Sequence, residues 1–346
     1  MRQGMSYRIY FYQSIIDACT LCEFLVIGRG SLQGCLGDTI RDLHFFNNQY
    51  IYSIMKTKIL IFAVALIALL SCSEKNAPSN PNAENGELVG LFSIGADKQI
   101  HFSQGNLQYN PQSKTWQFAK NQWDIIGNDN KNISYDYDGW IDLFGWGTGK
   151  NPTLVTMDSN DYSTFSEWGD NAISNGGNQI NQWRTLTKEE WVYLFRGRKN
   201  AQELFGFGKV AGVNGIIILP DDWKKSNAIN IPGFVASTRE DKGLKWQNSG
   251  QYGGDGYYSN DNGNNYEHNT YSSSEWHKME EQGAVFLPAA GARGSAEMYN
   301  VGSTGYYMST TPRGTEDAFG ISFDTNLFLI QGEYGREYGR SVRLVR

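Results

Sequence analysis

A run of twelve apolar residues, Ile59–Leu70, limits which part of this 346-residue chain can form a globular domain. Lys56 and Lys58 precede the run, and a serine and Cys72 follow it. An export signal consists of a basic segment, an apolar segment and then small residues, in this order. Twelve helical residues extend only about 18 Å, which is short of the roughly 30 Å hydrocarbon core of a membrane. We therefore expect a signal peptide over residues 55–71 and no spanning helix.

The residues around Cys72 resemble the lipobox of bacterial lipoproteins, in which the closing cysteine is lipidated and becomes the new N-terminus. The motif here reads Leu69-Leu70-Ser71-Cys72. The resemblance implies a lipid anchor at Cys72 as the only membrane contact, on a bacterial outer membrane and facing the cell surface. Residues 72–87 are polar, with two prolines and no apolar run. Such a composition is typical of a flexible tether.

Residues 1–54 stand before this signal, although a signal peptide belongs at the start of a chain. We interpret them as a mis-called upstream extension, with translation beginning at Met55. The alternative is a zinc site built from three cysteines and one histidine of this stretch, Cys19, Cys22, Cys35 and His44. Thiolates and imidazoles suit zinc, but one CxxC without a second pair is a weak signal. We therefore expect no metal site.

The part of the chain from Cys72 onward has 275 residues and is acidic. The whole chain has 30 basic and 36 acidic residues, and 6 of the basic and 4 of the acidic residues precede Cys72. The part from Cys72 onward therefore has 24 basic and 32 acidic residues, a net charge of about −8. This charge supplies no basic patch, and nucleic acid is not expected as a partner. Cys72 is the only cysteine of this part, so no internal disulfide stabilises it. All ten tryptophans lie here with many glycines, which favours short strands and turns around large rings.

Two helices are predicted. Thr187–Glu190 reads Thr-Lys-Glu-Glu, a capping box in which the threonine hydroxyl and the second glutamate each satisfy a free backbone N–H group. Trp191, Leu194 and Phe195 then follow at helical spacing. The second helix is predicted over Ser274–Gln282, with a glycine directly after it as the stop.

Short strands are predicted elsewhere. Alternating apolar residues indicate a hairpin within residues 100–118, with its turn at Asn110–Ser113. Ile216–Leu219 and Ala284–Leu287 are typical of buried strands. The strands predicted near the C-terminus are Tyr306–Ser309, Phe319–Phe323, Phe328–Ile330 and Ser341–Val345. Two helices among many short strands indicate an α+β domain.

Five segments resemble, in this order, domains related to formylglycine-generating enzymes. They read WRTLTKEEWVYLFRGR, GVNGIIILPDDW, AVFLPAAGARG, GYYMSTTP and GRSVRLVR, at Trp183–Arg198, Gly212–Trp223, Ala284–Gly294, Gly305–Pro312 and Gly339–Arg346. The same order recurs in major paralogous domain lipoproteins of gut-type bacteria and in the targets of diversity-generating retroelements. The resemblance covers roughly residues 88–346.

The resemblance implies a C-type-lectin-like fold for residues 88–346, an α+β domain with two helices, a small twisted antiparallel sheet and many loops. It also implies a ligand face on the C-terminal strands and loops. Met308 stands where that family is expected to have a tryptophan. The positions that vary in retroelement targets correspond here to twelve residues: Arg313, Glu316, Asp317, Phe319, Asp324, Asn326, Phe328, Gln331, Glu333, Tyr334, Glu337 and Tyr338.

Enzymatic chemistry finds little support. The best-known activity of this family needs a cysteine thiol, and none follows Cys72. The histidines His101, His268 and His277 are scattered, and no nucleophile-elbow pattern surrounds a serine. A glycosidase-type pair of carboxylates cannot be recognised from sequence spacing. We therefore expect no enzyme.

Calcium is the one cofactor for which the sequence offers ligands. The loop Asn260–Asn265 is rich in the hard oxygen atoms that calcium prefers. It lacks the spacing of an EF-hand, and the sugar-coordinating EPN or QPD motif of C-type lectins is absent from the sequence. Loops of this composition are usually turns, so we expect no cofactor.

The direct repeat Glu333–Arg340 leaves two interpretations open. Tyr334 and Tyr338, with Arg336 and Arg340, are typical of a paratope-like surface with rigid aromatic anchors. They are equally typical of a last hairpin packed on the core. We expect a surface-anchored, non-enzymatic module that binds a protein or glycan. The alternatives are a structural component of a cell-envelope complex and an enzyme of unknown chemistry on the same scaffold.

Overall fold

The structure is a computed structural model that describes residues 85–223, 233–239, 242–252, 254–260 and 266–346. The chain divides into two compact units, Met1–Ala77 and Pro78–Arg346, and all described residues belong to the second. The expected extension, signal peptide, lipidated Cys72 and zinc alternative lie outside the described residues, as do residues 261–265 of the proposed calcium loop. Within the described ranges, no helix is both long and apolar enough to cross a membrane.

An antiparallel five-stranded sheet carries the C-terminal part of the chain, in the order β13-β14-β15-β8-β7. Its strands are β13 (Gly305–Arg313), β14 (Asp317–Phe323), β15 (Leu327–Gly335), β8 (Tyr257–Ser259) and β7 (Lys245–Gln247). β8 pairs with β15 only at Leu327 and Phe328. β14 pairs with β15 along most of its length, so β13, β14 and β15 form the main body of this sheet.

A four-stranded sheet, ordered β10-β6-β5-β9, and three hairpins complete the strands. The sheet consists of β10 (Val285–Pro288), β6 (Val213–Ile218), β5 (Phe205–Val210) and β9 (Thr270–Tyr271), with β9 parallel to β5. The hairpins are β1 (Phe92–Gly95) with β2 (Lys98–Ile100), β3 (Leu107–Asn110) with β4 (Thr115–Phe118), and β11 (Ala292–Gly294) with β12 (Glu297–Tyr299). The hairpin and the two buried strands predicted from apolar patterns are therefore confirmed.

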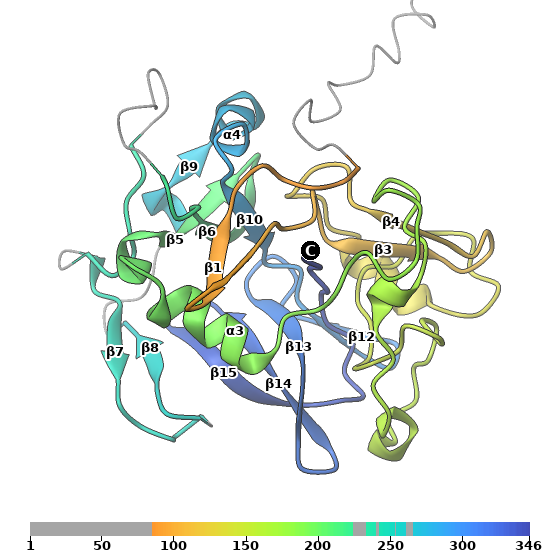
Figure 1. The fold of residues 1–346 in the computed structure, drawn as a ribbon. Coiled ribbons are helices and arrows are strands. Elements are labelled where there is room, and N and C mark those ends of the chain that lie inside the picture. The colour runs from red at the N-terminus through yellow and green to blue at the C-terminus, as the bar shows by residue number, and fades with distance from the viewer. Residues whose placement is uncertain (1–84, 224–232, 240–241, 253, 261–265) are drawn as a thin grey trace, which may run out of the picture. The chain divides into compact units, whose positions relative to one another are not determined.

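Helices are few and short in the described part of the chain. They are α3 (Lys188–Val192), a π-helical turn (Tyr193–Gly197), α4 (Ser273–Glu280) and five 3-10 turns at Gly127–Asn132, Ser159–Tyr162, Trp168–Asp170, Ala201–Glu203 and Tyr266–His268. Both predicted α-helices are present, and each begins with a capping box, at Thr187 and at Ser272. Figure 1 shows α3 lying across β13, β14 and β15.

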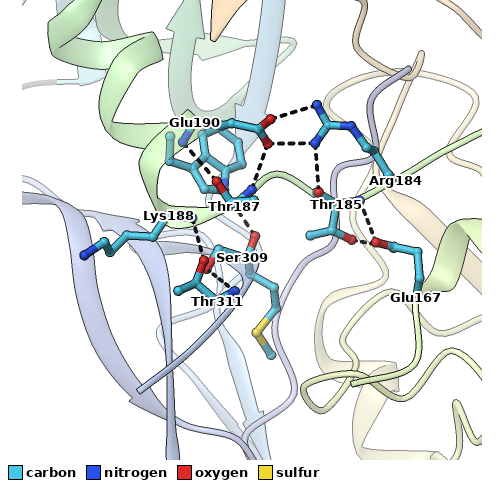
Figure 2. A network of polar contacts seen from close by, with 10 residues as sticks. Glu167, Arg184, Thr185, Thr187, Lys188, Glu190, Ser309 and Thr311 are labelled. Carbon is cyan, nitrogen blue, oxygen red and sulfur yellow. Dashed lines mark hydrogen bonds and ion pairs between the residues drawn. The ribbon is translucent and has the colours of Figure 1, made fainter. Parts of the chain in front are cut away.

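A polar network fixes the start of α3 (Figure 2). The Glu190 carboxylate accepts two hydrogen bonds from the Arg184 guanidinium, at 2.7 and 3.0 Å, and a third from the Thr187 backbone N–H at 3.0 Å. The Lys188 backbone N–H donates to the Thr311 hydroxyl on β13 at 3.0 Å. The capping box thus satisfies the free N–H groups of the helix and also ties α3 to the five-stranded sheet.

The predicted fold class is wrong. Fifteen strands in five sheets of two to five strands dominate the described residues, so the expected domain of two helices with one small sheet does not describe them. Several strands span only two to four residues between turns, so their alternation is too brief to be counted from the sequence. The predicted strand Ser341–Val345 is also absent, because its backbone forms single bridges to Phe102, Arg184 and Tyr307 instead of one ladder.

Three clusters of buried apolar side chains form the core. One lies between α3, the four-stranded sheet and the five-stranded sheet, and includes Trp191, Phe207 and Phe328. Another gathers rings from the turn-rich middle of the chain, including Phe144 and Trp168. The third lies under α4, around Trp276. The aromatic residues thus serve mainly as core packing, which compensates for the absence of disulfides among the described residues.

Candidate functional site

The twelve residues predicted to bind a ligand lie on β14, β15 and the ends and turns beside them, but they differ in accessibility. Three are exposed: Arg313, Glu316 and Asn326. Seven are half-buried: Asp317, Phe319, Asp324, Glu333, Tyr334, Glu337 and Tyr338. Two are buried: Phe328 and Gln331.

Phe328 is a core residue and does not belong to a ligand site. It is 0% exposed, and its ring lies 4.7 Å from that of Phe195 and 5.5 Å from that of Phe205. The family position implied a surface role for Phe328. It is buried because α3 and the four-stranded sheet cover the side of β15 on which it lies.

Several predicted residues hold the sheet together. Arg313 on β13 forms an ion pair with Glu333 on β15, with 2.6 Å between its Nε and the carboxylate. The Asp324 carboxylate accepts hydrogen bonds from the backbone N–H groups of Asn326 and Leu327, which closes the turn between β14 and β15. These contacts are local, and the turn residues do not converge on one site.

Gln331 lines a cavity beside α3. The cavity has a volume of about 390 Å³ and is also lined by Lys188 and Arg196 of the helical segment and by Asp255. The Lys188 ammonium lies 4.5 Å from the ring centre of Phe319, and the Arg196 guanidinium lies 3.6 Å from that of Trp246. Both cations therefore lie on aromatic rings.

Two further predicted residues, Tyr334 and Tyr338, take part in a tyrosine cluster. We define this cluster as Tyr306, Tyr334 and Tyr338 around Arg340, together with Tyr299, which lies beside Tyr338. The rings of Tyr306 and Tyr334 meet edge to face, with their centres 5.9 Å apart. Tyr299 and Tyr338 flank Gly294, where both rings would contact an added Cβ. Tyr299 is 41% exposed and the other three tyrosines are half-buried, so the cluster presents aromatic surface to solvent.

Arg340 forms the base of the tyrosine cluster. Its guanidinium lies 4.7 Å from the ring centre of Tyr334, 5.5 Å from that of Tyr338 and 6.0 Å from that of Tyr306. Only Nη1 donates hydrogen bonds, to the carbonyls of Gly335 and Tyr338, and Nε has no partner among the described residues. Burial lowers the pKa of Arg340 to about 10, so the guanidinium remains charged at neutral pH.

The tyrosine hydroxyls are held in different ways. Tyr334 donates to the Ser322 hydroxyl on β14, and Asn300 donates to the Tyr306 hydroxyl at 3.2 Å. Burial raises the pKa of the Tyr334 hydroxyl, which is therefore neutral at physiological pH. Tyr299 and Tyr306 were not among the predicted site residues, because their proximity to the repeat arises from strand pairing between β13 and β14 and from the β11–β12 hairpin.

Other candidate chemistry is accounted for by structural contacts. Burial raises the pKa of Asp142 to about 6, but its carboxylate is fully buried and accepts hydrogen bonds from the Ile126 backbone and the Asn130 side chain. His101 contacts the Leu88 carbonyl and Glu87, and His277 contacts Glu280. Within the described ranges, no three His, Cys, Asp or Glu side chains are grouped in a way that could hold a metal ion.

Comparison with known proteins adds no assignment. No protein-family model, curated protein or solved structure matches this chain. Function is therefore inferred from the geometry of the site.

Proposed function

We propose that this chain is a lipid-anchored, non-enzymatic binding module of a bacterial outer membrane that recognises a protein or glycan through the tyrosine cluster. The observation that supports this proposal is a buried, charged Arg340 with three partly exposed tyrosines within 6.0 Å of its guanidinium and a fourth, Tyr299, beside Tyr338. Tyrosine offers a large, rigid contact area and a polar hydroxyl at low entropic cost, which is why it is abundant in binding surfaces.

Arg340 strengthens this proposal. The Arg340 guanidinium is buried, its Nε has no hydrogen-bond partner among the described residues, and burial lowers its pKa by more than the nearby Glu337 carboxylate raises it. The surrounding tyrosine rings reduce the free-energy cost of burying this charge through cation–π contacts, which at such sites contribute about 1 kcal/mol each. A ligand group that accepts hydrogen bonds at the edge of the cluster gains from this charge.

The proposal is tested with the full chain on a glycan array and in a pull-down from candidate host and bacterial surfaces. The double variant Tyr299→Ala/Tyr338→Ala should reduce binding at least about tenfold, because central aromatic anchors contribute about 2 kcal/mol or more to an interface. Tyr135→Ala is the matched control, since Tyr135 is 83% exposed and belongs to another part of the chain. Equal binding by the double variant and the control would exclude the tyrosine cluster as the binding surface.

The membrane anchor is tested separately. Metabolic labelling with a radioactive fatty acid should mark the wild-type chain and leave the Cys72→Ser variant unlabelled. An intact mass that retains residues 1–71 in the cell-envelope fraction would contradict the lipoprotein part of the proposal.

A further inference from the structure

A second cavity lies outside the tyrosine cluster, at the aromatic and glycine-rich segment Trp140–Gly149. It has a volume of about 450 Å³ and is lined by residues within 146–154 and 161–170. This volume falls within the range of small-molecule sites in proteins. Neither the resemblance to known domains nor the function proposed above assigns a role to this cavity.

The floor of the cavity is held by backbone hydrogen bonds. The Ser166 N–H donates to the Gly147 carbonyl at 2.9 Å, and the Gly149 N–H donates to the Ser166 carbonyl at 3.1 Å. The Asn171 side chain also donates to the Gly149 carbonyl at 3.0 Å. A site with a fixed floor loses little conformational entropy when a ligand binds.

Two aromatic rings form one wall. Trp146 is held by a hydrogen bond from its Nε1 to the Ser309 carbonyl at 3.0 Å, and the Arg336 guanidinium lies 4.3 Å from its ring centre. The half-buried ring of Phe165 lies 5.0 Å from Trp146 and 5.4 Å from Trp168. Trp146 is therefore rigid support, and Phe165 is the aromatic ring that a ligand can reach.

The polar groups of the cavity include some that lack partners. The Ser166 hydroxyl is buried and has no hydrogen-bond partner among the described residues. Asp170 is exposed and likewise makes no contact with a described donor. The Glu167 carboxylate is held by the backbone N–H and hydroxyl of Thr185, at 3.0 and 2.7 Å. A buried hydroxyl without a partner is costly and indicates a place for a ligand or water.

The charges around the cavity restrict the ligand. Three carboxylates, Asp161, Glu167 and Asp170, line it with a single ammonium group, that of Lys150. Excess negative charge repels anionic ligands, whereas carboxylates readily accept hydrogen bonds from hydroxyl groups. An accessible ring beside such acceptors suits the C–H face of a sugar.

We propose that this cavity binds a neutral saccharide of one or two rings, with Asp170 and Ser166 bonding its hydroxyl groups and Phe165 packing against its ring. This inference is independent of the tyrosine cluster, which is formed by residues of β12, β13, β15 and the C-terminal segment and involves none of the residues that line the cavity. The two sites can therefore fail or succeed separately.

The test uses ligand-observed saturation-transfer NMR on the full chain, with maltose, cellobiose, lactose and diacetylchitobiose at millimolar concentration. At least one should receive transfer, whereas sialyllactose and spermidine should receive none. Asp170→Asn and Ser166→Ala should each weaken binding by about tenfold, the effect expected for a lost hydrogen bond to a ligand hydroxyl. Asp97→Asn, at an exposed carboxylate in the β1–β2 turn, is the matched control and should bind as the wild type does.

Absence of transfer to all four neutral disaccharides would overturn the proposal. Preferential binding of sialyllactose would overturn it too, because the charge argument would then be wrong. Preferential binding of spermidine would overturn it because the cavity would then select a cation and not a neutral saccharide. Binding that is unchanged in both Asp170→Asn and Ser166→Ala would place the saccharide elsewhere on the protein.

Discussion

Arg336 and Arg340 occupy equivalent positions in two copies of the sequence Glu-Tyr-Gly-Arg, yet their surroundings differ. Arg336 donates to three carbonyls, those of Asp317, Tyr162 and Gly314, and stacks on Trp146. Arg340 donates through one nitrogen only and lies beneath three tyrosine rings. Both are buried, at 4% and 6% exposure, so burial alone does not distinguish them.

The difference separates an arginine that donates to three carbonyls from one whose hydrogen-bonding capacity is not fully used. Arg336 donates to carbonyl groups at the start of β14 and in the β13–β14 turn. The Nε of Arg340 has no hydrogen-bond partner among the described residues, and the tyrosine rings around Arg340 are partly exposed to solvent. The two interpretations of the repeat, core packing and recognition, therefore each fit one of its copies.

The largest expected effect comes from replacing the two arginines by methionine, which keeps the apolar stem. Arg336→Met should lower the free energy of unfolding by about 3–4 kcal/mol, because three hydrogen bonds and a cation–π contact are lost. Arg340→Met should change it by less than about 1 kcal/mol, since the variant also removes an unpartnered buried nitrogen. Urea denaturation followed by tryptophan fluorescence measures both. Equal losses would remove the distinction between the two copies.

The glycines of the repeat extend the comparison. An added Cβ at Gly339 would lie 2.9 Å from Nη2 of the buried Arg293 and 3.1 Å from the Leu143 carbonyl. At Gly335 it would meet only the Glu337 carboxylate, the flexible end of a side chain. Gly339→Ala should therefore cost about 2 kcal/mol of unfolding free energy, and Gly335→Ala less than about 0.5 kcal/mol. A larger loss at Gly335 would mean that the first copy is the more tightly packed one.

The two tyrosines of the repeat should differ by a smaller amount. Tyr334→Phe removes the hydrogen bond to Ser322 and should cost about 1 kcal/mol of unfolding free energy. Tyr338→Phe should cost less than about 0.5 kcal/mol, because its hydroxyl makes no hydrogen bond with the described residues. Thermal unfolding at neutral pH compares the variants. Ligand binding that survives both changes would show that the ring surface, and not the hydroxyls, carries recognition.

The smallest effect is a pH dependence from Tyr334. Burial raises the pKa of its hydroxyl above the ordinary value of 10.0, so the unfolded chain ionises first. The stabilisation is complete below pH 10 and is lost as the pH rises toward the pKa of the folded state. Between pH 9 and pH 11 the wild type should lose up to about 1 kcal/mol more than Tyr334→Phe. Parallel curves for the two proteins would contradict the burial of this hydroxyl.

Local patterns in the sequence predicted local structure well. The capping box at Thr187 depends on residues three positions apart, and the structure confirms it. The β3–β4 hairpin and the buried strands β6 and β10 were likewise recognisable from short apolar patterns. In each case the interactions that decide the conformation lie within a few residues of one another.

The class of fold was not recognisable in this way. Strands such as β7, β8 and β9 span three residues or fewer, so pairing with distant partners decides that they are strands at all. The sequence also could not show that Phe328 lies outside the site. The alternating pattern around Phe328 does not say which face of β15 is covered by other elements. Phe328 is buried because it lies on the face of β15 that α3 covers.

Sequence alone determined the acidic charge, the lack of cysteine after Cys72, the signal-like segment and the starts of the two helices, because these depend on composition or near neighbours. Tertiary structure decided which arginine of the repeat has its hydrogen bonds made to carbonyls and which is surrounded by tyrosines. Tyr306 reaches Arg340 through the pairing of β13 with β14, and Tyr299 reaches Tyr338 through the pairing of β11 with β12. A recognition surface assembled from separate strands depends on their register, and register is a property of the packed sheet.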